Sequence, residues 1–183
     1  MRAFIAIDLP EKIKKKIAEL ENDFKKCNLT FKWVKPENLH LTLKFLGNIN
    51  QEQINKINEA ITTVSGKFAA FEASLSSFGF FPNARKPRVF FISIDKEELF
   101  KSIASELEKE LETLGFEKED RFKSHITLAR IKNLKNIESL KEKIKNTRLD
   151  EEFPADTITL YKSTLTKEGP IYEKIARSSL RNK

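Results

Sequence analysis

A strict alternation of apolar and polar residues runs through Leu39-His40-Leu41-Thr42-Leu43-Lys44-Phe45. A period of two over seven residues predicts a β-strand with one buried face. His40 and Thr42 then point from the same face, with Cα atoms about 6.6 Å apart, or two strand rises. The pattern therefore predicts an imidazole and a hydroxyl side by side on the polar face of a sheet.

The same pattern recurs in Ser124-His125-Ile126-Thr127-Leu128, where His125 and Thr127 share one face. The chain contains two histidines in all, and each lies in a His-x-Thr motif with matching aliphatic neighbours. An internal repeat explains this coincidence best. If the repeat folds as a pseudo-symmetric pair, the two polar faces would meet across a groove.

Two histidines and two threonines suit acid–base chemistry on a phosphate ester. Histidine takes up or gives a proton near neutral pH, so a pair supplies both an acid and a base. Threonine hydroxyls donate hydrogen bonds that stabilise charge on phosphate oxygens. A single buried histidine on a sheet is more often a core residue, and threonine is a common strand former. The repetition favours the catalytic interpretation, namely metal-free cleavage of a phosphodiester.

The stretch 33–47, from Trp33 to Gly47, resembles the first signature of the 2′-5′ RNA ligase family, in the two-histidine (2H) phosphoesterase superfamily. Residues 124–130 are similar to the second signature. Residues 2–8 and 162–172 resemble the two ends of family members. The resemblance thus spans nearly the whole chain.

The resemblance implies an RNA 2′,3′-cyclic phosphodiesterase that opens a terminal cyclic phosphate to a 2′-phosphomonoester. It assigns His40 as the proton donor and His125 as the proton acceptor. Thr42, Thr127 and Arg130 would bind the phosphate. From the residues alone, the pseudo-symmetry leaves open which histidine is the acid. Two other functions also stay open: an ATP-independent 2′-5′ RNA ligase, and a basic RNA-binding module without turnover.

Strand alternation makes different predictions for two cations beside the motifs. Arg130 would lie on the face opposite His125, so that either a bulge or the strand end turns it toward the phosphate, or its role is structural. Lys44 is predicted to lie on the same strand face as His40, where it would contact the RNA backbone or be solvated. Three aromatic residues, Trp33, Phe45 and Phe81, would stack on bases or pack in the core, and core packing is favoured.

Charge and composition limit the remaining classes. The net charge is +7 and the pI is near 9.4, which favours a polyanionic partner such as RNA ends, tRNA fragments among them. Cys27 is the one cysteine, so an internal disulfide is excluded and a reducing compartment is expected. No apolar stretch approaches 18 residues, and the run 4–7 is too short for a signal peptide. We expect a cytoplasmic protein that does not bind membranes, a monomer without an obligate protein partner.

The sequence also disfavours metal and nucleotide cofactors. It has no histidine pair at i and i+4 and no cysteine cluster, so a zinc site lacks ligands. Its glycines never cluster into a phosphate-binding loop.

Helical and strand periods predict an α+β fold in one two-lobed domain over residues 1–183. The expected arrangement is a bilobal, pseudo-twofold pair of antiparallel sheets with helices outside and a central groove. Asn50 with Gln53, and Asp95 with Glu98, resemble capping pairs at the starts of two helices. The predicted strands cover 2–8, the two motifs, 68–81, 88–94, 157–165 and 171–177, and the predicted helices follow Pro10, Asn50, Asp95 and Asn136.

Overall fold

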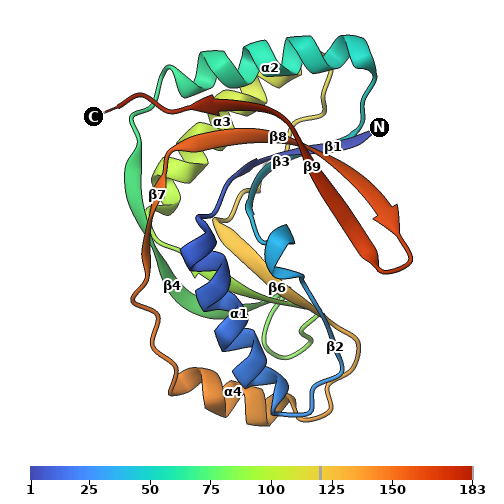
Figure 1. Cartoon of the computed structure of the whole chain (residues 1–183), viewed down its shortest axis with the longest axis vertical. Helices are drawn as coiled ribbons and strands as arrows, with labels where there is room; N and C mark the ends of the chain where they lie inside the picture. The colour runs from blue at the N-terminus through green and yellow to red at the C-terminus, as the bar shows by residue number, and fades with distance from the viewer. Residues whose placement is uncertain (120, 183) are drawn as a thin grey trace.

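A computed structural model describes residues 1–119 and 121–182 (Figure 1). In this part of the chain the helices are α1 (Glu11–Lys25), α2 (Gln51–Ser65), α3 (Glu97–Glu112), α4 (Ile137–Lys145) and a short 3-10 helix, η1 (Pro36–Asn38). The strands are β1 (Arg2–Ile7), β2 (Phe31–Trp33), β3 (Leu41–Asn48), β4 (Phe71–Phe81), β5 (Val89–Ile94), β6 (His125–Ile131), β7 (Glu152–Ala155), β8 (Thr157–Thr166) and β9 (Gly169–Ser179). The sequence did not predict β2 and β7, because strands of three and four residues are too short to show a period.

The strands form a sheet in the order β7-β4-β5-β6-β3-β1-β8-β9, with β2 paired to β6. Every pairing between these strands is antiparallel in the described residues. The two motif strands, β3 and β6, are neighbours in the middle, where Leu41 pairs with Ile126. The predicted α+β class and its two antiparallel halves are therefore confirmed, and the halves join at the motifs.

Helices cover the two halves in pairs (Figure 1). Helices α2 and α3 lie with β8 and β9 in the upper half of the view, and α1 and α4 lie in the lower half with β2, β4 and β6. The α1 residue Phe24 packs its ring against Phe78 of β4 and Phe90 of β5, at centroid distances of 5.2 and 5.7 Å. Burial of such apolar faces is the main stabilising contribution. None of the helices in residues 1–119 and 121–182 is long and apolar enough to cross a bilayer.

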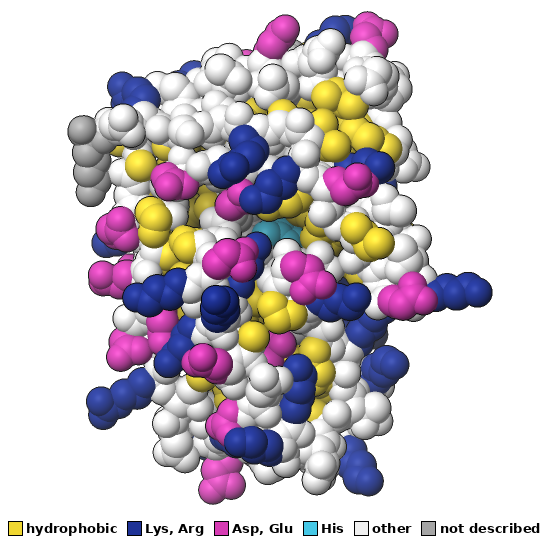
Figure 2. All heavy atoms as spheres, in the orientation of Figure 1, with side chains coloured by type: hydrophobic (Ala, Val, Ile, Leu, Met, Phe, Trp, Pro, Cys, Tyr) yellow, Lys and Arg dark blue, Asp and Glu magenta, His cyan; other side chains and the backbone are white. Residues whose placement is uncertain are grey.

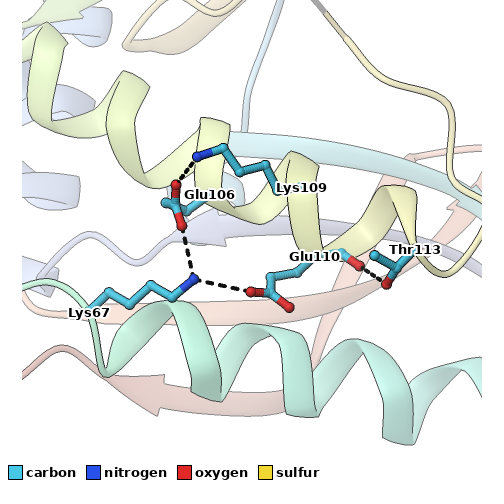
Figure 3. A network of polar contacts seen from close by, with 5 residues as sticks. All are labelled: Lys67, Glu106, Lys109, Glu110 and Thr113. Carbon is cyan, nitrogen blue, oxygen red and sulfur yellow. Dashed lines mark hydrogen bonds and ion pairs between the residues drawn. The ribbon is translucent and has the colours of Figure 1, made fainter.

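A surface network joins the end of α2 to α3 (Figure 3). Lys67 lies between two carboxylates of α3, 2.9 Å from Glu106 and 3.1 Å from Glu110. Lys109 also pairs with Glu106, and the Thr113 hydroxyl donates to the carbonyl of Glu110. A single exposed ion pair contributes little to the free energy of unfolding. The network therefore adds to a packing of α2 and α3 that the core already determines.

The two predicted caps have different outcomes. Asn50 and Gln53 form a reciprocal capping box at the start of α2, which confirms that prediction. The prediction for Asp95 is wrong. The residue before α3 is Lys96, whose backbone is in a left-handed conformation, and no side chain caps the helix. The Asp95 carboxylate instead accepts the N–H of Ser74, at 2.6 Å. The backbone N–H of Ser74 thus binds the Asp95 carboxylate in place of the N–H groups at the start of α3.

Each motif strand contains a bulge directly after its threonine. On β3, Thr42 pairs with Ala6 and Lys44 with Ile5, so Leu43 is the extra residue. On β6, Thr127 pairs with Phe91 and Ala129 with Phe90, so Leu128 is the extra residue. A bulge shifts the side-chain alternation by one. Residues beyond it therefore lie on the opposite face from the one that simple alternation predicts.

Candidate active site

The Leu41–Ile126 pair brings the two motifs into register. Counting one residue outward in this antiparallel pair places His40 across from Thr127, and Thr42 across from His125. Opposed residues in such a pair have Cβ atoms about 5 Å apart, and diagonal neighbours lie about 7–8 Å apart. The two histidines occupy a diagonal of this four-residue set, which leaves room for a phosphate between them.

These four side chains line one groove of about 540 Å³. Its walls come from β1, β3, β6 and the β8–β9 hairpin. In the space-filling view, histidine atoms lie in a hollow in the middle of the face, with basic and acidic side chains around it (Figure 2). The structure thus brings together the residues that the repeat singled out.

Both imidazoles are held in the same way. Nδ1 of His40 lies 2.7 Å from the carbonyl oxygen of Asn38, and Nδ1 of His125 lies 2.7 Å from that of Lys123. A carbonyl only accepts hydrogen bonds, so each Nδ1 carries the hydrogen. In both rings Nε2 is then the nitrogen that takes or gives a proton.

His40 lies in an aromatic enclosure. Its ring centroid is 4.7 Å from that of Phe4 and 5.3 Å from that of Tyr172, and Tyr161 lies behind them at 6.2 Å. Burial lowers the pKa of His40 to about 4, which the bond to the Asn38 carbonyl only partly opposes. At neutral pH and without substrate, His40 is therefore uncharged.

His125 has a similar but smaller apolar surround. Its ring contacts Phe81 edge-on at 5.0 Å and Phe91 at 5.5 Å between centroids. Burial lowers its pKa, the Lys123 carbonyl opposes this, and the nearby Lys123 charge adds to the lowering. An anionic phosphate between the rings would raise the pKa of both histidines, because opposite charge favours the imidazolium.

Asn38 has two contacts at the site, neither of which is indicated by the sequence. Its carbonyl orients His40, and its side-chain Nδ2 donates to the carbonyl of Pro170 at 2.8 Å. Pro170 lies in the β8–β9 hairpin, which projects from the right of the molecule (Figure 1). Asn38 therefore ties the hairpin wall of the groove to the backbone that holds a histidine.

The hydroxyl of Tyr161 is engaged behind the site. It donates to Asp8, whose other carboxylate oxygen lies 2.7 Å from Lys174 Nζ. Burial and the Asp8 carboxylate raise the pKa of Tyr161 above its ordinary value. Tyr161 is thus a packing partner of His40, and its phenolic proton is not available for transfer.

The bulges determine where the neighbouring cations lie. Arg130, two residues beyond Leu128, is exposed and lines the groove with His125 and Thr127. Of the alternatives for Arg130, a bulge that turns it toward the motif residues is the one observed. Lys44 is only 2% exposed and forms an ion pair with Glu108 of α3, at 3.0 Å. The expectation that Lys44 contacts RNA or solvent is therefore wrong.

The three aromatic residues have different positions. Phe45 occupies the position in the first motif that Arg130 occupies in the second. It is 60% exposed and lines the groove, so the expectation that Phe45 packs in the core is wrong. Phe81 stacks on Phe91 at 4.1 Å beside His125. Trp33 is half-buried against the core, yet part of it also lines the groove.

Possible metal ligands are dispersed. Within residues 1–119 and 121–182, no three His, Cys, Asp or Glu side chains form a group that could hold a metal ion. Cys27 is half-buried at the end of α1.

Two separate segments of the chain, residues 7–91 and residues 92–172, match the same family, described as LigT like phosphoesterase. The chain belongs to the LigT-like phosphoesterase family. Each match contains one His-x-Thr motif, which agrees with the internal repeat. The predicted family and the predicted enzyme class, a phosphoesterase hydrolase, are thereby confirmed.

Relatives match over nearly the full length. An RNA 2′,3′-cyclic phosphodiesterase from Methanocaldococcus jannaschii is 39% identical over 177 residues, which cover 96% of this chain and 98% of that protein. A second, from Thermotoga maritima, is 36% identical over 94% of this chain and 92% of its own. The crystal structure of TT0787 from Thermus thermophilus is 30% identical, with a TM-score of 0.82, and the alignment covers 100% of this chain and 99% of that one. This LigT-like chain therefore shares both sequence and fold with them.

Proposed function

We propose that the protein is a metal-independent RNA 2′,3′-cyclic phosphodiesterase that opens a terminal cyclic phosphate to a 2′-phosphomonoester. The observation that carries this proposal is the diagonal pair of histidines, each with Nδ1 bonded to the backbone and Nε2 available. The names of the M. jannaschii and T. maritima relatives support the choice of substrate.

In the proposed reaction, His125 Nε2 takes a proton from water as its oxygen attacks phosphorus. The bond from phosphorus to the 3′-oxygen breaks, and His40 Nε2 gives its proton to that oxygen. Acid and base on opposite sides of the phosphorus suit an in-line displacement. Hydroxyl hydrogen bonds from Thr42 and Thr127 would stabilise charge on the non-bridging oxygens, and Arg130 would add its fixed positive charge.

The order of proton transfer follows the family resemblance, with His40 as donor. In the free site the pKa of His40, about 4, favours the neutral form. His40 therefore acts as the donor only after the phosphate anion has raised its pKa. Binding of the phosphate thus produces the protonated His40 that serves as the general acid.

The first experiment uses an oligoribonucleotide that ends in a 2′,3′-cyclic phosphate, incubated with the protein in EDTA. We expect a 2′-phosphate product, and we expect His40→Ala and His125→Ala each to lower the rate by ~10² to 10⁴. A 2′-5′ joined product would instead favour a ligase, and binding without turnover would favour an RNA-binding module. Near-normal turnover in either alanine variant would contradict the acid–base mechanism.

A second substrate separates the two histidines. When sulfur replaces the 3′-oxygen, the leaving thiolate needs no protonation, so loss of the general acid matters less. We expect His40→Ala to regain most of its lost rate with this substrate and His125→Ala to stay slow. The reverse pattern would exchange the two roles and leave the pair itself in place.

A further inference from the structure

A second hollow lies directly beside the catalytic groove. Its volume is about 630 Å³, and it is formed by the β4–β5 loop on one side and the segment after β6 on the other. Four cations line it: Lys86, Arg88, Arg130 and Lys132. No carboxylate is among the described residues that line it, so its charge is of one sign.

These four cations are free of ion pairs in the described part of the chain. None of them lies within salt-bridge distance of an Asp or Glu of residues 1–119 and 121–182. Elsewhere on the surface a lysine such as Lys67 is held by two carboxylates. Like charges that line one hollow repel each other, and an anion bound among them would relieve that repulsion.

The hollow adjoins the groove at Arg130, which lines both. Lys132 follows directly after the end of β6 and lines the hollow together with Arg130. On the opposite wall, the Asn83 carboxamide accepts the N–H groups of Arg85 and Lys86 and so fixes the loop that presents Lys86. The four cations thus lie on two facing walls of one hollow that adjoins the catalytic groove.

We propose that this hollow is a second phosphate-binding subsite, which holds an internal phosphodiester of an RNA strand whose cyclic-phosphate end lies between the histidines. The proposal rests on the proposed function and extends it to the form of the substrate. A 2′,3′-cyclic phosphate occupies the 3′ end of a strand, so the remaining nucleotides and their phosphates extend from the 5′ side. Fixed cations that track a backbone bind it without regard to sequence. The preferred substrate is therefore an oligonucleotide, because a mononucleotide has no phosphate for this subsite.

The test compares substrates of different length. We would measure kcat/KM for a nucleoside 2′,3′-cyclic monophosphate and for a tetranucleotide with the same cyclic end. The variant Lys86→Glu/Arg88→Glu should lower kcat/KM for the tetranucleotide about tenfold or more and change the mononucleotide rate by less than about twofold. The control, Lys12→Glu/Lys101→Glu, makes the same change of net charge with exposed lysines of α1 and α3 and should leave both rates unchanged.

Binding gives a readout that does not depend on turnover. Fluorescence anisotropy with a labelled tetranucleotide should show weaker binding by the loop variant, and a slope of log affinity against log salt that is shallower by about 1 to 2, since each lost contact removes ~0.7. Wild-type protein with equal kcat/KM for both substrates, or a loop variant with unchanged binding and salt slope, would refute the subsite. If the wild type opens neither cyclic substrate, the proposed function fails, and the binding comparison still decides on the subsite.

Discussion

Replacing Lys44 with methionine should destabilise the protein strongly, because it leaves a carboxylate buried without its cation. Lys44 Nζ lies 3.0 and 3.1 Å from the two carboxylate oxygens of Glu108 and 2.5 Å from the carbonyl oxygen of Glu117. Lys44 is 2% exposed and Glu108 is 7% exposed. Loss of one partner of such a buried pair costs about 3–5 kcal/mol. A domain is stable by only about 5–15 kcal/mol, so a large share of the total would be lost.

The assay is a double-mutant cycle in urea. We expect Lys44→Met to lower the free energy of unfolding by about 3–5 kcal/mol, and Lys44→Met/Glu108→Leu to recover most of that loss, because an apolar pair of similar volume replaces the ion pair. A single variant that loses less than about 1 kcal/mol, or a double variant that loses the sum of both singles, would refute this account.

Two further predictions concern the histidines and their neighbours. Because burial holds the pKa of His40 near 4, the folded protein binds fewer protons than the unfolded chain between that pH and about 6.5. The free energy of unfolding should therefore fall as the pH falls through this window, by about 2–3 kcal/mol more than in the His40→Asn variant. If the urea midpoints of the two proteins depend on pH in the same way, this prediction is wrong. Gly79→Ala would place a Cβ 2.7 Å from Cε2 of Phe91, a ring that contacts His125, so it should cost about 1–3 kcal/mol and lower kcat. Gly66→Ala, whose nearest atom would be 3.5 Å away, is the matched control and should leave kcat unchanged.

The site was predictable because its signal is local and repeated. The alternation around His40 and His125 specifies a strand face, and the repeat indicates that the two faces belong together. The capping box of Asn50 and Gln53 was equally local, and the structure contains it. Such features depend on residues within a few positions of each other, which a single sequence shows directly.

The errors have a common physical origin in long-range contacts. Lys44 continues the alternation in the sequence, but the bulge at Leu43 turns it toward α3, where Glu108 compensates its charge. Asp95 is of a residue type that often caps helices, but its carboxylate accepts the N–H of Ser74 instead. The role of Asn38 depends on Pro170, which lies far away in sequence. In each case a partner distant in the chain determines the position of the side chain.

The paired bulges have a consequence for how proteins of this fold acquire new substrates. Each bulge separates the shared chemistry of its half, a histidine with its threonine, from the side chain two positions beyond the extra residue. In one half that side chain is Phe45 and in the other it is Arg130, so the two duplicated copies have already diverged there. Substitutions of Phe45 would alter what the groove recognises and leave the histidines and threonines in place, whereas Arg130 is itself a proposed phosphate ligand. Specificity can therefore change at the Phe45 position without a change in the chemistry of the site.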